Sequence, residues 1–294
     1  MYKFCLRILT LLFLVMGAGC SESSSHEPYI LSNEKIEIPE TSHSKTTEAY
    51  QLNYRSDGLE VSGFVVKPKE INEDLPLLIF NRGGNQEYSK IDERMLSGYL
   101  SYWANKGYVV LASQYRGNDR GEGKEEFGGA DINDVLNLTH VAEELEDVDT
   151  NNKVMLGTSR GGMMTYLALK EEMDIQAAAV VSGISDLFLF YEEREAAMKR
   201  GLAEWVGDPD TEKEEYEKRS ASYWSEKLSS PLFILHGDED EKVSVEHSRK
   251  LADQLEPRSQ DFKYKEYEGG GHGLTNYAEE YTEEVDDWFK RYIN

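Results

Sequence analysis

The stretch LGTSRGGM, residues 156–163, lies between an apolar run and a segment that is typical of a helix. It contains a Gly-x-Ser-x-Gly pattern centred on Ser159. A pattern this short has about 0.1 chance matches in a chain of this length, because glycine and serine are each about 7% of residues. Its surroundings must therefore decide whether Ser159 is a nucleophile or a residue of a glycine-rich turn.

Short apolar strands alternate with amphipathic helices on both sides of this stretch. The expected strands cover residues 48–54, 59–66, 75–80, 108–113, 153–156, 175–181, 231–235 and 262–267. The expected helices follow residue 159 and cover residues 95–103, 130–145, 244–255 and 277–292. This alternation predicts an α/β fold, with a mostly parallel sheet covered by helices on both faces. In such a sheet the loops at the carboxyl ends of the strands carry the site, and Ser159 lies in one of them.

Ser159 has the setting that a nucleophilic serine needs. A hydroxyl is a weak nucleophile until a base takes its proton, and a tight strand-to-helix turn exposes its oxygen. Gly157 and Gly161 let the strand and the helix approach closely. The start of a helix also points N–H groups outward, where they stabilise an oxyanion. We expect the backbone N–H of Arg160 to be one of these donors.

The base is expected to be a histidine in a loop after Ser159. The chain has six histidines, at positions 26, 43, 140, 236, 247 and 272. The first two precede the domain, His140 lies within a helix, and His247 is expected on the solvated face of another. His236 precedes the candidate acids, against the chain order of serine, acid and histidine that accompanies this turn. His272 follows the last strand in the loop GGGHG, residues 269–273, whose glycines let it fold back, and we expect it to be the base.

The acid is expected within HGDEDEKV, residues 236–243. A carboxylate there would hold the imidazole in one tautomer and balance the imidazolium that forms during attack. The local sequence does not choose between Asp238 and Asp240. In a chain of net charge −24, any one carboxylate is by default a solvated charge.

These motifs together resemble the prolyl oligopeptidase family of serine peptidases. The family's acid motif, His-Gly-x-x-Asp-x-x-Val, is similar to residues 236–243, and its serine and histidine motifs are similar to residues 157–162 and 270–273. Further similarity lies at residues 115–117, 121, 123, 207–209, 216 and 220, so the resemblance covers roughly residues 48–294. It implies an α/β-hydrolase fold, and it assigns the acid role to Asp240. It also implies that Ser159, Asp240 and His272 cleave peptide bonds through an acyl-enzyme.

Two features depart from the family pattern. Many members carry His-Gly-Gly-Pro or a tyrosine after the early strand, where a group completes the oxyanion hole. This chain has NRGG at residues 81–84, and Asn81, at the matching position, is the expected second donor. Large members also carry a β-propeller before the catalytic domain, and the residues before 48 are too few to form one. A small helical cap at residues 186–230 is expected over the site instead.

The first 19 residues predict a signal peptide, with Lys3 and Arg7 before an apolar run and small residues at 17–19. Cys20 then resembles the acylated cysteine of bacterial lipoproteins. We therefore expect export to the bacterial cell envelope and attachment to the membrane through a lipid on Cys20. Residues 20–47, rich in serine, glutamate and threonine, predict a flexible tether, and residues 48–294 predict the catalytic domain.

Composition excludes some partners and leaves some functions open. A net charge of −24 opposes nucleic acid binding, and no spacing of metal ligands appears, so neither a metal nor another cofactor is expected. Residues 117–124, GNDRGEGK, fail as a phosphate loop because Glu125 stands where serine or threonine is required. The expected partner is a small peptide or ester. The alternatives are a carboxylesterase for small acyl esters and a catalytically silent binding lipoprotein.

Overall fold

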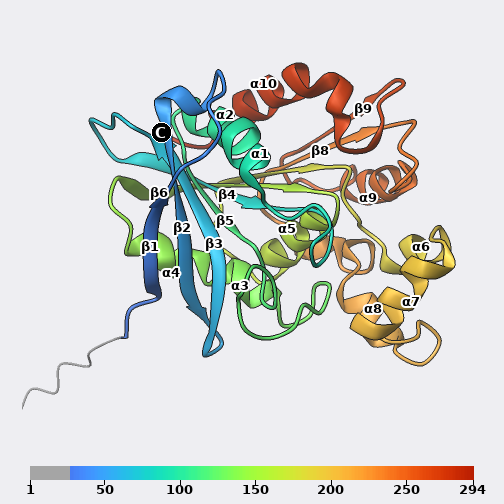
Figure 1. Cartoon of the computed structure of the whole chain (residues 1–294). Coiled ribbons are helices and arrows are strands. Elements are labelled where there is room, and N and C mark those ends of the chain that lie inside the picture. Colours follow the sequence, from blue (N-terminus) through green and yellow to red (C-terminus); the bar gives the residue numbers. More distant parts are fainter. Residues whose placement is uncertain (1–26) are drawn as a thin grey trace, which may run out of the picture.

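A nine-stranded sheet crosses the protein in the order β1-β2-β3-β5-β4-β6-β7-β8-β9 (Figure 1). The structure is a computed structural model, and it describes residues 27–294. The strands are β1 (Ile30–Ile36), β2 (Thr47–Ser56), β3 (Leu59–Pro68), β4 (Leu75–Asn81), β5 (Val109–Ser113), β6 (Val148–Thr158), β7 (Ala177–Val181), β8 (Leu232–Gly237) and β9 (Phe262–Tyr267). β5, β4, β6, β7, β8 and β9 pair in parallel, and the first three strands join antiparallel. The predicted mostly parallel sheet is confirmed.

Local sequence explains the regular parts of the sheet. Asp57 and Gly58 both have positive φ, 52° and 77°, which is the geometry of a two-residue hairpin turn between β2 and β3. Every residue of β5 and β7 is buried, as expected for apolar strands covered on both faces.

Helices cover both faces of the sheet (Figure 1). On one face lie α1 (Glu93–Met95), a π-helical turn (Leu96–Leu100), α2 (Ser101–Asn105) and α10 (Ala278–Phe289). There Trp103 of α2 packs against Phe289 of α10, with ring centroids 6.2 Å apart. On the other face lie α3 (Ile132–Leu136), α4 (Leu138–Glu143), α5 (Arg160–Lys170) and α9 (Glu246–Leu255). The two layers bury separate apolar clusters.

Residues 186–230 form an insertion between β7 and β8, at one end of the sheet (Figure 1). It contains α6 (Leu187–Glu192), α7 (Ala196–Trp205), α8 (Lys213–Lys218) and two 3-10 turns (Ala221–Tyr223 and Ser225–Lys227). The ring of Phe127, from the main domain, stacks on Phe190 and Trp205 of the insertion, with centroids 6.2 and 5.6 Å away. Aromatic packing of this kind holds the insertion, called the cap below, against the domain.

The prediction of a flexible tether over residues 20–47 is wrong for the part that the structure describes. β1 pairs with β2 along its length, and Thr41 Oγ1 donates a hydrogen bond to the Ser97 carbonyl at 2.6 Å. β1 is a polar edge strand, ILSNEKI, and its few apolar residues made it resemble a linker. Residues 30–47 therefore belong to the domain.

Cys20 and the predicted signal peptide lie outside the described residues. Between residues 27 and 294, none of the helices combines the length and the apolar character that crossing a membrane requires.

Candidate active site

Ser159 lies in a strained turn between β6 and α5. Its φ of 59° and ψ of −122° are unfavourable for a residue with a side chain, and such backbone strain costs on the order of 1–3 kcal/mol. Two hydrogen bonds hold the turn, from Ser159 N to the Val181 carbonyl and from Gly162 N to the Ser159 carbonyl, both at 2.9 Å. The turn leaves Ser159 half-buried at the edge of a cavity.

The two glycines of the motif are required by close backbone contacts. A Cβ atom at Gly161 would overlap the carbonyl oxygen of Asn81, and one at Gly157 would overlap the carbonyl oxygen of Gly161. Strand β4, strand β6 and helix α5 therefore meet at a distance that only glycine permits. This contact fixes the position of Ser159 at the end of the sheet.

Asp240 and His272 are in direct contact. His272 Nδ1 lies 2.8 and 3.0 Å from the two carboxylate oxygens, and Asp240 Oδ1 also accepts the backbone N–H groups of Lys242 and Val243. Burial alone would raise the pKa of Asp240, but the hydrogen bonds of His236 and His272 outweigh it and hold that pKa well below its usual range. An ionised carboxylate at Nδ1 favours the tautomer whose Nε2 can accept a proton.

The structure distinguishes the two acids that the sequence left open. The Asp240 side chain is fully buried, whereas Asp238 is exposed. Asp238 Oδ1 accepts the backbone N–H of Gly269 at 2.6 Å, so it contacts the loop of His272 and not its ring. Of these two acids, Asp240 is the one that contacts the imidazole of His272.

His236 lies behind this pair. Its Nδ1 is 2.7 Å from Ser248 Oγ, its Nε2 is 2.9 Å from the Val243 carbonyl, and the same Nε2 is 3.3 Å from Asp240 Oδ2. Chain order excluded His236 as the base, but it gave no indication that His236 contacts Asp240, the candidate acid. The residue is fully buried, and its contacts orient the Asp240 carboxylate.

The expectation of a solvated His247 is wrong. The side chain is fully buried, and its Nδ1 accepts the backbone N–H groups of Ser185 and Asp186 at 3.2 and 3.3 Å. Burial lowers its pKa, against the opposing effect of Glu193. The helical pattern predicted one buried face for α9, the face that packs on the sheet. It could not show that the cap also covers the face that carries His247.

Ser159 and His272 line one cavity of about 390 Å³. Gly84 and Tyr88 line it from the loop after β4, and Val243 lines it from the loop of the acid. The cap contributes Phe190, Arg194, Glu195, Ala197 and Met198. The cavity therefore combines the candidate nucleophile and base with a partly apolar wall.

The side chain of Asn81 does not line this cavity. It is 1% exposed, and its amide donates a hydrogen bond to Thr165 Oγ1 of α5 at 3.0 Å. The backbone after Asn81 reaches the serine instead, because a Cβ atom at Gly83 would lie 3.2 Å from Ser159 Cβ. Asn81 is the expected second oxyanion donor, and its side chain is not placed to take that role.

The other expected donor, the backbone N–H of Arg160, lies at the first position of α5. An N–H at that position has no partner within the helix and is open to a ligand. Sequence patterns predicted no role for the Arg160 side chain, which is buried in contact with Glu125 and Asp131. A buried arginine needs acidic partners, but nothing in the local sequence identified which ones.

Comparison with known proteins places this site in a family. A sequence model of the prolyl oligopeptidase family matches residues 94–294, and one of acetyl xylan esterases matches residues 31–133. The uncharacterized peptidase YtmA of Bacillus subtilis is 34% identical over 227 residues, which are 76% of this chain and 84% of that protein.

Solved structures share the fold. A puromycin-hydrolyzing peptidase of Mycobacterium tuberculosis superposes with a TM-score of 0.75 at 21% identity, over 88% of this chain but only 41% of that protein. The esterase Pf2001 of Pyrococcus furiosus superposes with a TM-score of 0.67 at 18% identity, over 90% of this chain and all of the esterase. The sheet is thus that of the α/β-hydrolase fold. Together with the family match over more than half of its length, these findings show that the chain is a serine hydrolase that belongs to the prolyl oligopeptidase family.

Proposed function

We propose that this protein cleaves peptide bonds with a triad of Ser159, His272 and Asp240. Ser159 Oγ attacks the carbonyl carbon while His272 takes the hydroxyl proton at Nε2. The same histidine then protonates the leaving amine, and water releases the acyl group from Ser159 by the reverse route. The observation that carries the proposal is the contact between His272 Nδ1 and the buried Asp240 carboxylate, beside the cavity that Ser159 lines.

Two backbone donors are proposed for the oxyanion. One is the N–H of Arg160, at the start of α5. The other comes from Gly83 or Gly84, in the loop that approaches Ser159. Neither glycine N–H donates a hydrogen bond to another group within residues 27–294, so both remain available to a substrate oxygen. Donors of this kind stabilise the negative charge that develops during attack.

The cavity favours a substrate with one small apolar group beside the scissile bond. Phe190, Met198 and Ile184 give it an apolar wall, and its volume of about 390 Å³ suits a side chain or a short acyl group. The cap supplies part of this wall but does not enclose a chamber. We therefore expect no sharp limit on the length of the remaining substrate.

Ester hydrolysis is the second candidate activity. The match of residues 31–133 to acetyl xylan esterases favours it, and the same triad chemistry serves both bonds. The comparisons with hydrolases weigh against the third alternative, a silent binding lipoprotein.

The test is a panel of short peptides beside aryl esters of small acids, assayed with the wild-type protein and with Ser159→Ala. A peptidase gives higher kcat/KM for peptides than for matched esters of the same acyl group, after allowance for the intrinsic reactivity of each bond. Turnover of esters alone would assign the protein to the second candidate. Turnover of both classes that persists in Ser159→Ala would reject the triad.

We further propose that the protein is exported to the bacterial cell envelope and anchored by a lipid on Cys20. The support is the sequence of residues 1–20, with its positive start, apolar run and small residues before the cysteine. Mass spectrometry of the mature N-terminus should find acylated Cys20 in a membrane fraction. A soluble protein with a different N-terminus would contradict this proposal.

A further inference from the structure

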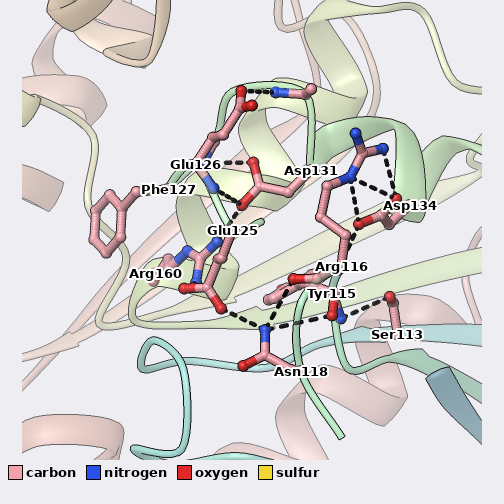
Figure 2. Close-up of polar contacts among 12 residues, drawn as sticks. Ser113, Tyr115, Arg116, Asn118, Glu125, Glu126, Phe127, Asp131, Asp134 and Arg160 are labelled. Atoms are coloured by element: carbon pink, nitrogen blue, oxygen red, sulfur yellow. Dashed lines mark hydrogen bonds and ion pairs between the residues drawn. The ribbon is translucent and has the colours of Figure 1, made fainter. Parts of the chain in front are cut away.

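A cluster of buried charges includes the side chain of Arg160, the residue that follows Ser159. The Arg160 side chain is 1% exposed, and its guanidinium contacts the carboxylates of Glu125 and Asp131, the latter at 2.5 Å. Figure 2 shows Arg160, Glu125 and Asn118 turned toward one another, and Asn118 Nδ2 donates to Glu125 at 2.6 Å. Arg82, fully buried, also contacts Glu125 at 3.4 Å. Two arginines thus face two carboxylates, and their charges cancel.

The two arginines of the cluster differ in their pKa. Burial, together with the charge of Arg160, lowers the pKa of Arg82. Burial disfavours the charge on Arg160, but Asp131 and Glu125 outweigh burial and raise the pKa of the guanidinium. The ring of Tyr115 lies close to both guanidinium groups, 4.8 Å from Arg160 and 5.0 Å from Arg82. Removing one carboxylate would leave two buried arginines with a single carboxylate as counter-charge.

This cluster binds the backbone of the loop over residues 82–86. Arg160 Nη1 donates to the Gly84 carbonyl at 3.1 Å, and Arg82 Nη1 donates to the Gly83 carbonyl at 3.0 Å. The Glu125 carboxylate accepts the N–H of Gln86 at 3.1 and 3.2 Å. The loop is therefore held at three successive points by side chains that lie on its buried side.

Hydrogen bonds to two carbonyl groups of this loop, from Tyr115 and Arg82, decide where the next N–H groups point. In a trans peptide the N–H of one residue points opposite to the carbonyl of the residue before it. The Arg82 carbonyl accepts the Tyr115 hydroxyl at 3.1 Å, so the N–H of Gly83 points away from the cluster. The Gly83 carbonyl is held by Arg82, so the N–H of Gly84 also points away. One of these two N–H groups is the second oxyanion donor that we propose, beside the N–H of Arg160.

We propose that Glu125 and Arg160 are positioning residues, which hold the 82–86 loop so that its N–H groups complete the oxyanion hole. This inference rests on the proposed hydrolase mechanism. Arg160 then has two functions. Its backbone N–H is one oxyanion donor, and its side chain holds the loop that supplies the second donor in position. Glu125, whose position excluded a phosphate loop, gains a function through the same contact with Gln86.

The variant Glu125→Gln tests the proposal, because it keeps the shape of the side chain and removes its charge. We expect kcat to fall by about 10²-fold, the effect of losing one oxyanion donor, with little change in KM. Glu126→Gln is the matched control. Glu126 is the next residue and is exposed, and within residues 27–294 its carboxylate bonds only to the N–H of Ala130. The control should retain wild-type activity.

A pair of substrates separates positioning from a general loss of structure. Sulfur accepts hydrogen bonds poorly, so an intact oxyanion hole favours an oxoester over the thionoester with the same groups. Glu125→Gln should lower the ratio of the two kcat/KM values toward that of a site with one donor. Glu125→Asp keeps the negative charge, but its shorter side chain moves the carboxylate away from the N–H of Gln86. It serves as the second variant if Glu125→Gln does not fold. Its ratio should fall as well.

The possible results are distinct. An unchanged oxoester to thionoester ratio in a folded Glu125 variant overturns the positioning role while wild-type hydrolysis stands. An equal loss for both substrates gives this unchanged ratio and indicates a structural effect. A wild-type protein that hydrolyses neither peptides nor esters rejects the proposed function itself.

Discussion

His272 Nδ1 lies 2.8 Å from Oδ2 of Asp240, although the two residues are 32 positions apart in the chain. Asp240 follows β8 and His272 follows β9, which are neighbouring parallel strands. Their carboxyl ends open at the same edge of the sheet as the Ser159 turn, so the fold brings the three residues to one edge.

Asp240→Asn is expected to lower kcat about 10⁴-fold, because an amide stabilises the wrong tautomer of the imidazole. Asp238→Asn is the control, since the carboxylate of Asp238 accepts the backbone N–H of Gly269 in the histidine loop. Steady-state rates on one ester and one peptide measure both variants. If Asp238→Asn proved the more damaging change, the acid would be misassigned.

Gly161→Ala is expected to disrupt the serine turn, because its Cβ atom would overlap the Asn81 carbonyl oxygen. We expect a loss of at least about 1–3 kcal/mol in the free energy of unfolding, together with lost activity. Gly98→Ala is the control, since Gly98 lies in a helical turn with no heavy atom near its added Cβ. Urea unfolding compares them, and equal stability of the two variants would refute the close contact.

Because of His247, the free energy of unfolding should decrease as the pH is lowered. Its pKa is lowered in the fold, so the folded protein favours the neutral ring. That contribution is complete above the unfolded value of about 6.5 and is lost as pH falls below it, because the unfolded chain binds the proton first. Urea unfolding of wild type and His247→Gln from pH 8 to pH 5 measures the difference. A difference between the two proteins that does not shrink below pH 6.5 would contradict this assignment.

Deletion of β1 should destabilise the domain. A chain that starts at Thr47 loses the partner of β2 and exposes a new sheet edge. Each 1 kcal/mol lost would lower Tm by roughly 2–4 °C in a protein of this size. Thermal melts should place this chain below one that starts at residue 27. Equal melting temperatures would restore the interpretation of residues 30–46 as a tether.

The sequence predicted those features that short-range patterns determine. Alternating apolar segments gave the strands and helices, and the Gly157 and Gly161 spacing gave the turn at Ser159. The choice between Asp238 and Asp240 required the family resemblance, because both stand in one acidic stretch and only the fold orients them toward or away from His272.

The features that the sequence did not predict depend on distant contacts. β1 is ordered by pairing with β2, not by its own composition. His247 is buried where Phe190 and Glu193 of the cap contact it, and Glu125 meets Arg160 across 35 positions of the chain. Asn81 was expected to serve the oxyanion because of its position in the sequence, but the hydrogen bond to Thr165 directs its amide into the interior.

The central claim is that Ser159 is a nucleophile activated by His272. The most direct measurement is the rate of labelling by a fluorophosphonate, followed by mass spectrometry of the modified peptide. The account predicts one adduct per chain, located on Ser159, with no adduct in Ser159→Ala and a labelling rate that falls by several orders of magnitude in His272→Ala, as in serine hydrolases that lose a triad member. An adduct on another residue, or labelling of Ser159 at an unchanged rate without His272, would contradict it.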